Sequence, residues 1–438
     1  ASAGDGMSHD WQGRRSGGLS GQATVPGDKS ISHRAIMLAA LAEGESVIEG
    51  FLEGEDTRAT ARIFAQLGVR IETPNPHTRI VQGVGLHGLR ASAEALDCGN
   101  AGTGMRLLTG LLSAQAFNST LTGDASLSKR PMARVIRLLE KMGARISARD
   151  GDFAPLRIHG GQTLRGIEID TQVASAQVKS ALIFAALYAE GETLITEPRP
   201  TRDYTESMLK SLGWPIEYRP GEVLVRGGGS LNAGDIRIPG DISSAAFLIA
   251  AAMLIPGSDI TLLNIGVNPR RTGILSAFEL MGGRIDLLNE RRQSGEPVAD
   301  IRVRSSVLQG IELPEHLVPD MIDECPIFFV AAALVQGKTR AIGLAELRVK
   351  ESDRIASMVK GLRAMGAEVV ESADTLEITG GRLHAADIDS FEDHRIAMSF
   401  AVASQCADGV TAIHDCADVA TSFGGFVDLV NSLGMNLE

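Results

Sequence analysis

A short phrase occurs six times along the chain and limits the folds that the chain can adopt. Each copy has Leu or Met, then Gly, and three residues later Ile, Val or Leu, as in Gln66-Leu67-Gly68-Val69-Arg70-Ile71. The six glycines stand at positions 68, 143, 213, 282, 366 and 434, so they recur every 68 to 84 residues. A near-constant period indicates one supersecondary unit used several times.

Each phrase is predicted to end an amphipathic helix. In the fifth copy, apolar residues recur at three- and four-residue steps, at Ile355, Met358, Val359, Leu362 and Met365. A Gly directly after the last apolar turn is typical of a left-handed helix cap, and the branched aliphatic segment after it indicates a strand. Every copy therefore predicts a helix, a glycine cap and a strand. Further strands are expected at 222–226 and 376–380.

A longer repeat indicates two domains. The segment that begins Val25-Pro26-Gly27-Asp28 returns 213 positions later as Ile238-Pro239-Gly240-Asp241, and an Ala- and Leu-rich helix is expected after each. Three short units precede the second copy and three follow it, and 438 residues exceed one ordinary core. We therefore expect an N-terminal domain at 27–240 and a second domain at 1–26 plus 241–438, with crossings near residues 26 and 240.

The two copies differ in charge. The first carries Lys29 and Arg34 where the second carries Ile242 and Phe247. Cations at the start of a helix, where backbone N–H groups are unpaired, favour anion binding. We expect the first copy to bind a ligand and the second to serve as hinge and core.

Composition excludes several classes of function. The net charge of −12 and the aromatic content of 4% argue against nucleic-acid and anionic-membrane binding. The longest apolar stretch, 245–256, is too short to span a bilayer. The N-terminus lacks the apolar segment of a secretory signal, and Met7 is the expected natural first residue. Four cysteines without metal-ligand spacing predict reduced thiols in a cytoplasmic protein.

Several motifs place cations, hydroxyls, amides and small residues at predicted helix starts in the first half. These residues are Lys29, Ser30 and Arg34, the Asn100 to Gly102 turn, Arg130, and Ser175, Ala176 and Gln177. Such groups suit a phosphate or a polyol. Each also has a plainer interpretation, namely a capped surface helix, a tight structural turn or an ordinary N-cap.

The second half supplies carboxylates together with further cations. Asp323 precedes an apolar helix, Lys350, Glu351 and Arg354 lie in an alternating charged stretch, and Arg395 begins another helix. Asp323 alone is equally typical of an N-cap, and the charged stretch of a solvated face of ion pairs. Cations at several helix starts indicate a polyanionic ligand, and two acids beside it indicate proton transfer.

Seven motifs together resemble the EPSP synthase family of enolpyruvyl transferases. They are PGDKSISHR (26–34), GNAGTGMR (99–106), KRPM (129–132), ASAQVKSA (174–181), TRDYTE (201–206), RVKESDR (348–354) and DHRIAM (393–398). The resemblance implies an inside-out α/β barrel in two lobes, each with three βαβαββ repeats. It also implies enolpyruvyl transfer from phosphoenolpyruvate to the 5-hydroxyl of shikimate-3-phosphate, in the chorismate branch of aromatic amino acid biosynthesis.

The resemblance also implies roles for individual residues. Shikimate-3-phosphate would meet Lys29, Ser30, Arg34, Ser175, Ala176, Gln177, Arg202, Asp323 and Lys350. Phosphoenolpyruvate would meet Lys29, Asn100, Gly102, Arg130, Gln177, Arg354 and Arg395. Glu351 is the candidate donor of the proton to carbon, and Asp323, assisted by Lys29, the candidate acceptor from the hydroxyl. No metal or cofactor is implied. The inhibitor glyphosate would occupy the phosphoenolpyruvate site, and the expected state is a cytoplasmic monomer.

The chain departs from common family patterns at four positions, with Tyr204, Cys325, Thr421 and Gly424. Gly102 stands where glyphosate-insensitive relatives of this kind carry Ala. Two alternatives stay open. An enolpyruvyl transferase acting on UDP-N-acetylglucosamine would carry Lys-Asn in place of Lys29-Ser30 and usually a reactive Cys within 122–132. A non-catalytic repeat scaffold would not need the acids and cations.

Overall fold

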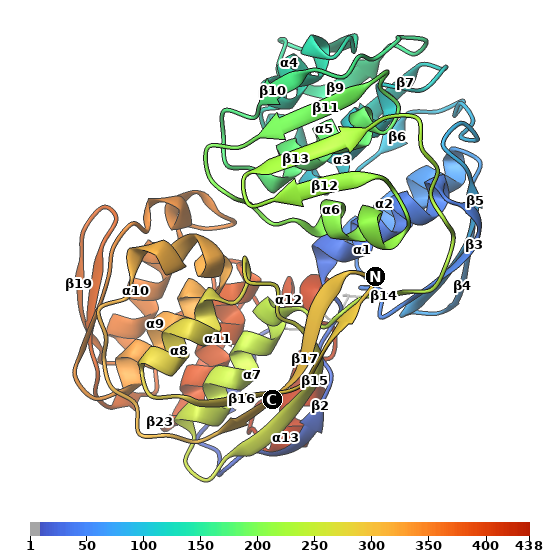
Figure 1. The fold of residues 1–438 in the computed structure, drawn as a ribbon. Helices are drawn as coiled ribbons and strands as arrows, with labels where there is room; N and C mark the ends of the chain where they lie inside the picture. The colour runs from blue at the N-terminus through green and yellow to red at the C-terminus, as the bar shows by residue number, and fades with distance from the viewer. Residues whose placement is uncertain (1–8) are drawn as a thin grey trace, which may run out of the picture. The chain divides into compact units, whose positions relative to one another are not determined.

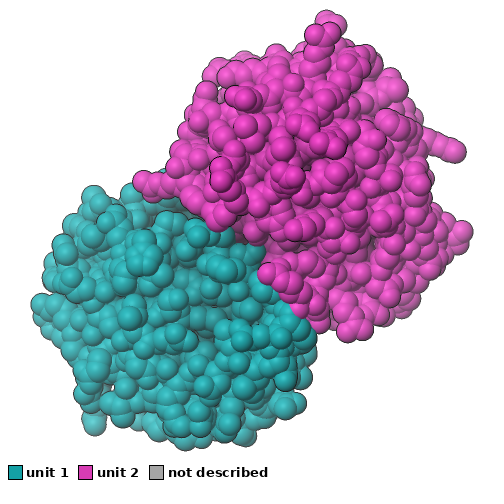
Figure 2. Space-filling model, viewed as in Figure 1, with its two compact units in different colours: residues 1–26, 239–291, 297–438 teal, residues 27–238, 292–296 magenta. Residues whose placement is uncertain are grey.

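The computed structural model describes residues 9–438, and its chain forms two compact units. Unit 1 holds the described residues up to Pro26, together with Pro239–Arg291 and Pro297–Glu438, and unit 2 holds Gly27–Ile238 and Arg292–Glu296 (Figure 2). Each unit has its own hydrophobic core. The expectation that Met7 begins the natural chain lies outside the described residues.

Unit 2 contains three four-stranded sheets of one topology, in the orders β14-β3-β5-β4, β6-β7-β9-β8 and β10-β11-β13-β12. In each sheet the first pair is parallel and the other two pairs are antiparallel. The strands are β3 (Glu43–Glu49), β4 (Arg70–Asn75), β5 (Thr78–Val84), β6 (Leu96–Asp97), β7 (Ser119–Thr122), β8 (Ile146–Arg149), β9 (Phe153–Ile158), β10 (Glu168–Asp170), β11 (Glu192–Thr196), β12 (Ile216–Arg219), β13 (Glu222–Arg226) and β14 (Ile236–Arg237).

Two α-helices accompany each of these sheets (Figure 1). They are α1 (Lys29–Leu41) and α2 (Glu55–Gln66), α3 (Gly102–Leu112) and α4 (Ala133–Lys141), and α5 (Ala176–Ala186) and α6 (Tyr204–Ser211), with a 3-10 turn η1 (Leu127–Lys129) before α4. The first helix of each pair is buried along most of its length because it carries apolar residues on nearly every side. Unit 2 therefore has helices inside and sheets outside.

Unit 1 repeats this plan with less regular sheets. Its strands are β1 (Trp11–Arg14), β2 (Ser20–Ala23), β15 (Asp259–Gly266), β16 (Arg284–Gln293), β17 (Glu296–Arg304), β18 (Lys338–Ala341), β19 (Glu368–Glu371), β20 (Leu376–Thr379), β21 (Leu383–His384), β22 (Asp387–Asp389), β23 (Ala407–Asp408) and β24 (Val410–His414). The sheet orders are β16-β17-β15-β2, β18-β20-β19, β1-β24-β22 and β21-β23. The tip of the β16–β17 hairpin, Arg292–Glu296, is the part assigned to unit 2.

The helices of unit 1 are α7 (Ile242–Leu254), α8 (Gly273–Leu280), α9 (Cys325–Leu334), α10 (Arg354–Ala364), α11 (His394–Ser404), α12 (Val419–Ser422) and α13 (Phe426–Leu433), with 3-10 segments η2 (Glu315–Glu324) and η3 (Ala345–Val349). The apolar helices α7, α9 and α11 pack on one another and form the centre of the unit (Figure 1). Phe247 and Ile242 are buried there, as expected for core residues. Within residues 9–438, no helix combines the length and the hydrophobicity of a membrane span.

The predicted glycine caps are confirmed. All six phrase glycines have positive φ, from +88° at Gly213 to +117° at Gly434. Five of them lie between a helix end and a strand, as Gly68 does between α2 and β4. The sixth, Gly434, follows α13 and leads to Leu437, which pairs with Gly13 in an isolated bridge. L-residues with a side chain avoid this backbone region, so each of the six helix ends requires a glycine. This requirement is why the phrase recurs in the sequence.

Candidate functional site

The candidate residues of unit 2 gather at one end of its buried helices. Lys29, Gly102 and Ala176 are the first residues of α1, α3 and α5. Gln177 of α5 reaches Thr103 of α3, and Arg34 of α1 reaches Ser180 of α5, so the N-terminal halves of the three helices lie together. Unpaired N–H groups and the positive ends of three helix dipoles therefore face one region.

Lys29 is the exposed cation of α1. Its neighbour Asp28 caps the helix by accepting the N–H of Ile31 at 3.0 Å. The Lys29 side chain is 47% exposed and its ammonium pairs with the Asp56 carboxylate. The side chain is thus fixed at its tip and yet open to a ligand.

Arg34 is buried and ties three helices together. Its Nε donates to Thr205 Oγ1 at 2.7 Å, one terminal nitrogen to Ser180 Oγ at 3.1 Å, and the other to the Ser30 carbonyl at 3.0 Å. Burial lowers the pKa of Arg34 to about 10, against the opposing effect of Glu206 and Asp28. The guanidinium therefore stays charged at neutral pH and fixes the first turn of α1.

A second cluster joins α3 and α5. Gln177 donates through Nε2 to Thr103 Oγ1 at 2.8 Å and accepts from an Arg106 terminal nitrogen at 2.9 Å. Ser175 caps α5 by accepting the N–H of Val178 at 3.3 Å. Arg106 belongs to the GNAGTGMR motif but is not among the residues predicted to bind a ligand. The available signal was its place one turn after Gly102, on the same face of the helix.

The Asn100 turn and Arg130 form a third cluster. Arg130 donates to Asn100 Oδ1 at 3.0 Å, and Asn100 Nδ2 contacts both oxygens of Asp124 at 3.1 and 3.0 Å. A Cβ atom on Gly102 would lie 2.8 Å from a terminal nitrogen of Arg130 and 3.1 Å from one of Arg106. The missing side chain of Gly102 thus lets two guanidinium groups approach the start of α3.

Arg202 lies partly exposed just before α6, and its charge contributes to the lowered pKa of Arg34.

Unit 2 also contains a buried ion network that was not predicted from the sequence. Lys179 contacts Glu206 at 2.9 Å and Glu197 at 3.3 Å, and all three side chains are at most 2% exposed. Burial raises the pKa of Glu206, and Lys179 opposes that shift.

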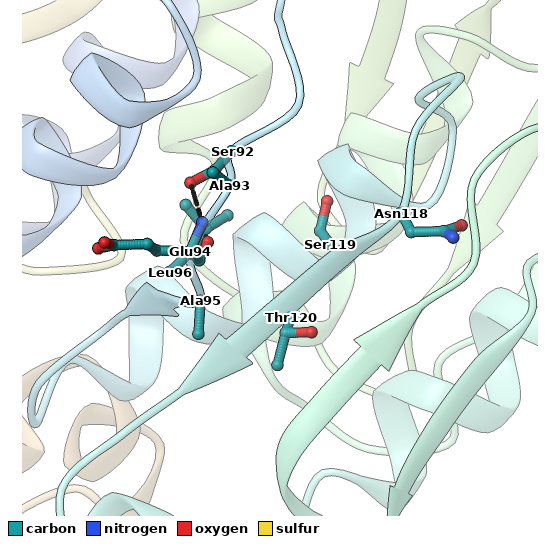
Figure 3. Close-up of a pocket in the computed structure, with 8 residues that line it drawn as sticks. All are labelled: Ser92, Ala93, Glu94, Ala95, Leu96, Asn118, Ser119 and Thr120. Carbon is teal, nitrogen blue, oxygen red and sulfur yellow. Dashed lines mark hydrogen bonds between the residues drawn. The ribbon is translucent and has the colours of Figure 1, made fainter.

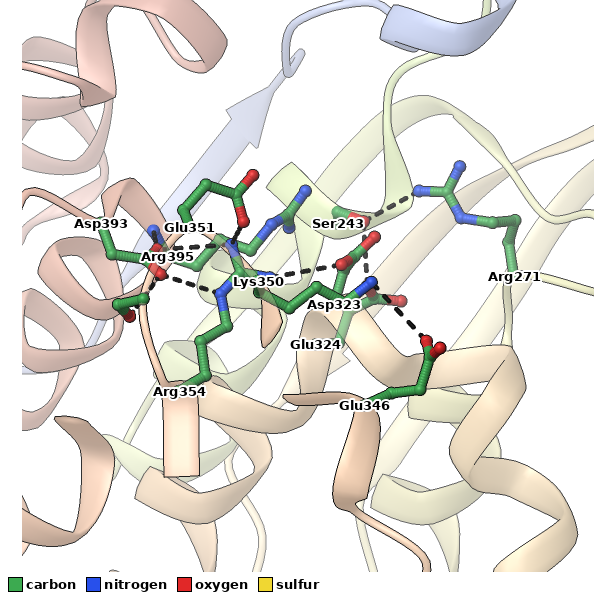
Figure 4. Close-up of polar contacts among 11 residues, drawn as sticks. Ser243, Arg271, Asp323, Glu324, Glu346, Lys350, Glu351, Arg354, Asp393 and Arg395 are labelled. Carbon is green, nitrogen blue, oxygen red and sulfur yellow. Dashed lines mark hydrogen bonds and ion pairs between the residues drawn. The ribbon is translucent and has the colours of Figure 1, made fainter. Parts of the chain in front are cut away.

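In unit 1, Arg354 is the centre of the candidate site (Figure 4). The guanidinium is 1% exposed and contacts Asp393 at 2.9 Å, Glu351 at 2.7 Å and Asp323 at 3.3 Å. The three carboxylates come from the end of η2, the loop before α10 and the loop before α11. One buried cation therefore brings together two of the predicted acids, Asp323 and Glu351.

Asp393 links this centre to α11. It caps the helix by accepting the Arg395 N–H at 3.0 Å, and it accepts from Ser352 Oγ at 2.8 Å. The guanidinium of Arg395 makes no hydrogen bond or ion pair with the residues at 9–438. The Arg395 guanidinium is therefore open to an anion. Burial, followed by Arg395, lowers the pKa of His394 to about 4, so this imidazole is neutral at pH 7.

Glu351 and Lys350 lie at the surface of the same site. The Glu351 side chain is 56% exposed. Burial is the largest single effect and raises its pKa, but Arg354, a backbone hydrogen bond, His394 and Arg395 together outweigh burial, and the pKa is lowered. Glu351 is thus an anion in this structure. Lys350 contacts Glu346 at 3.9 Å, which is a loose ion pair.

The four residues that depart from the family pattern have the following contacts. Tyr204 donates to Asp28 at 3.4 Å, and Cys325 is the buried first residue of α9. Thr421 lies in α12 and donates to the Asp418 carbonyl at 2.7 Å. A Cβ on Gly424 would meet only the Ala420 carbonyl, at 3.7 Å.

A pocket of about 140 Å³ lies elsewhere on unit 2 (Figure 3). Its lining residues are Ser92, Ala93, Glu94, Ala95, Leu96, Asn118, Ser119 and Thr120, and none of them is a predicted site residue. Across residues 9–438, no group of three His, Cys, Asp or Glu side chains is arranged to hold a metal ion.

His33 makes stability depend on pH. Burial, followed by Lys29, lowers its pKa to about 3 from 6.5. Between these values the unfolded chain binds a proton that the folded chain does not, so stability falls as pH falls. We expect the pH slope of the unfolding free energy between pH 6 and 4.5 to be smaller in His33→Gln by up to about 1.4 kcal/mol per pH unit. Denaturant titrations at each pH measure this slope, and His77→Gln, at an exposed histidine, is the control. Equal slopes for the wild type and His33→Gln would contradict the prediction.

Comparisons with known proteins show which family the chain is similar to. The family model for EPSP synthase (3-phosphoshikimate 1-carboxyvinyltransferase) matches residues 14–430. A 3-phosphoshikimate 1-carboxyvinyltransferase of Xanthomonas euvesicatoria is 58% identical over 430 residues, which cover 98% of each chain. The structure of EPSP synthase from Acinetobacter baumannii superposes with a TM-score of 0.94 at 47% identity, covering 98% of this chain and 99% of that one. An enolpyruvyl transferase of Streptomyces tendae, at 18% identity and a TM-score of 0.78, shares the fold. The chain therefore belongs to the EPSP synthase family.

Proposed function

We propose that the protein transfers the enolpyruvyl group of phosphoenolpyruvate to the 5-hydroxyl of shikimate-3-phosphate, releasing phosphate. Full-length membership of the EPSP synthase family supports this reaction. The observation that carries it is that unit 2 gathers cations at its helix starts and unit 1 gathers acids around Arg354. Cations bind two anionic substrates, and acids move the protons that the transfer requires.

Unit 2 is proposed to hold shikimate-3-phosphate and part of phosphoenolpyruvate. Lys29 and Ser30 offer an ammonium and a hydroxyl at the start of α1. Arg34 fixes that turn because its guanidinium donates to the Ser30 carbonyl. Ser175, Ala176 and Gln177 add the first N–H groups of α5 and an amide. Arg202 adds a further cation. The Asn100 turn, Gly102 and Arg130 are proposed to meet phosphoenolpyruvate, and Arg106 joins them through Gln177.

Unit 1 is proposed to hold the phosphoenolpyruvate carboxylate and the shikimate hydroxyls. Arg395 has an open guanidinium near the start of α11, and Arg354, the first residue of α10, contacts Asp393, which caps α11 (Figure 4). Lys350 is held only loosely by Glu346, so a shikimate hydroxyl can replace that contact at little cost. Asp323, 23% exposed, can accept a hydroxyl proton.

The chemistry needs one proton added to carbon and later removed. Protonation of the phosphoenolpyruvate methylene makes the central carbon electrophilic, and the 5-hydroxyl oxygen attacks it as Asp323, assisted by Lys29, takes the hydroxyl proton. The bond to the phosphate oxygen then breaks, and loss of a methyl proton restores the double bond.

Glu351 is proposed to give a proton to the methylene carbon and later to accept one of the three methyl protons. In the present structure it is ionised, which suits the accepting step. A bound carboxylate on Arg354 and Arg395 would neutralise those cations and so raise the pKa of Glu351 toward the range of a proton donor.

Phosphate release tests the proposed reaction. The purified protein is incubated with phosphoenolpyruvate and either shikimate-3-phosphate or UDP-N-acetylglucosamine. We expect phosphate with the first acceptor only. Release with the second acceptor alone would support the alternative enzyme, and release with neither would support a scaffold; the family assignment favours neither outcome.

Glyphosate is proposed to compete with phosphoenolpyruvate, and Gly102 to set its affinity. Gly102→Ala would press on Arg130 and Arg106, which lie 2.8 and 3.1 Å from the added methyl. We expect the glyphosate inhibition constant to rise about tenfold or more, since overpacking costs about 1–3 kcal/mol, and the KM for phosphoenolpyruvate to rise less because the substrate is shorter. Gly234→Ala, where a methyl meets nothing within 4 Å, is the control. An unchanged inhibition constant beside a raised KM would contradict the steric argument.

The remaining proposals concern the domain bounds, the cellular compartment and the oligomeric state. We propose domains at 27–240 and at 1–26 plus 241–438, with chain crossings near residues 26 and 240. We also propose a cytoplasmic monomer. The four cysteines are free thiols, which is typical of a reducing compartment, and each unit has a core of its own. Light scattering on the purified protein measures the mass in solution.

A further inference from the structure

The second Pro-Gly-Asp turn carries a polar network that its apolar sequence does not suggest. Asp241 accepts the Ser243 N–H at 2.9 Å at the start of α7, and it accepts from an Arg271 terminal nitrogen at 2.8 Å. Ser243 Oγ accepts from the same nitrogen at 2.8 Å and donates to Glu324 Oε2 at 2.9 Å (Figure 4). The hydroxyl of Ser243 therefore bridges Arg271 and Glu324.

This network is desolvated. Ser243 is 1% exposed, Glu324 2% and Arg271 4%. Buried hydrogen bonds to charged groups are stronger than exposed ones, and the loss of one partner leaves the others unsatisfied. The hydroxyl is thus a small group whose removal disturbs two buried charges.

The segment that the network anchors has little intrinsic rigidity. Glu324 is the last residue of η2, which consists of two short 3-10 stretches joined by a kink at Met321, with Pro319 inside the first. The hydrogen-bond geometry of a 3-10 helix is poor, and the kink interrupts the segment further. The place of η2 must therefore be set by its neighbours.

Two further contacts hold the preceding turn of η2. A Cβ on Gly273 would lie 2.8 Å from the Leu317 carbonyl and 3.1 Å from the Asp320 Cβ, so the start of α8 packs closely there. Arg270 contacts Asp320 at 3.9 Å. The loop that carries Arg270 and Arg271 thus runs along η2 and meets it near Asp320.

Asp323 lies between two anchors. It contacts Arg354 at 3.3 Å, and the next residue, Glu324, is bound to Ser243 at 2.9 Å. A catalytic carboxylate must be held within a fraction of an ångström, and a misplacement of about 1 Å costs up to about a hundredfold in rate.

We propose that Ser243, Arg271 and Glu324 are positioning residues that set the place of Asp323. The inference rests on the proposed function for the role of Asp323. It gives the second Pro-Gly-Asp copy a part in the reaction: the first copy presents Lys29 to the ligand, and the second fixes the acid.

Ser243→Ala tests this proposal, because it removes one hydroxyl and leaves both charges. We expect kcat to fall about tenfold while the KM values for both substrates stay within about twofold, since the acid is displaced and the binding cations are untouched. Amide hydrogen exchange at 315–324 should be faster. Ser244→Ala is the matched control, because Ser244 lies on the same turn, is 6% exposed and makes no side-chain hydrogen bond with residues 9–438.

Glu324→Gln is the second variant. It keeps an oxygen for Ser243 but removes the buried charge that Ser243 Oγ donates to, and it should give the same pattern of lower kcat and faster exchange. Wild-type exchange at 315–324 in both variants would overturn the proposal, even if the wild-type protein released no phosphate. Wild-type kcat in both variants of an active enzyme would also overturn it. An inactive wild type with faster exchange in Ser243→Ala would overturn the proposed function and support the anchoring.

Discussion

Lys179→Met is expected to lower the free energy of unfolding by about 3–5 kcal/mol, the range typical of breaking a buried ion pair. Lys179, Glu197 and Glu206 are at most 2% exposed, so removal of the ammonium leaves two carboxylates buried without their cation. Burial already raises the pKa of Glu206, and the loss of Lys179 would raise it further. Urea titration at pH 7 measures the change.

Two variants separate charge from packing. Lys210→Met changes an exposed lysine of α6 and should shift stability by less than about 0.5 kcal/mol. The double variant Lys179→Met, Glu206→Gln should be more stable than Lys179→Met alone, because one unpaired charge is removed. Wild-type stability of Lys179→Met would contradict the account of this network.

Glu351→Gln is expected to lower kcat by about 10²–10⁴-fold, the usual contribution of a positioned proton-transfer group. Gln matches Glu in shape but cannot give a proton to the methylene carbon or accept one of the methyl protons. Stability should change little, because the side chain is 56% exposed and Arg354 keeps Asp323 and Asp393. Steady-state kinetics with both substrates measures the effect.

Glu368→Gln, at an exposed position of β19, is the control and should leave kcat unchanged. If Glu351→Gln retained more than about a tenth of wild-type kcat, Glu351 would not be the proton donor to carbon.

The repeat explains why so much of the fold was predictable. Each short repeat passes from its helix to the next extended segment through a residue with left-handed backbone dihedrals. Gly68 and its five counterparts adopt that conformation. The candidate residues at helix starts were visible for the same reason, since a cap such as Asp28 and a cation such as Lys29 stand side by side in the sequence.

Contacts between distant segments could not be predicted in this way. The partners of Lys179 lie 18 and 27 residues further along, at Glu197 and Glu206, and nothing local distinguishes them from surface acids. The convergence of Asp323, Glu351 and Asp393 on Arg354 depends on three separate segments, namely the end of η2 and the loops before α10 and α11. The assignment of the β16–β17 hairpin tip to unit 2 had no signal in its residues.

Reaction in deuterated water tests the central claim most directly. The protein is incubated with shikimate-3-phosphate and phosphoenolpyruvate, and the products are examined by mass spectrometry and phosphate assay. We predict equimolar phosphate and an enolpyruvyl ether whose methylene carries deuterium, because the carbon is protonated from solvent and then loses one of three methyl hydrogens. The absence of both phosphate and ether would contradict enolpyruvyl transfer, and an ether without deuterium would contradict protonation at carbon.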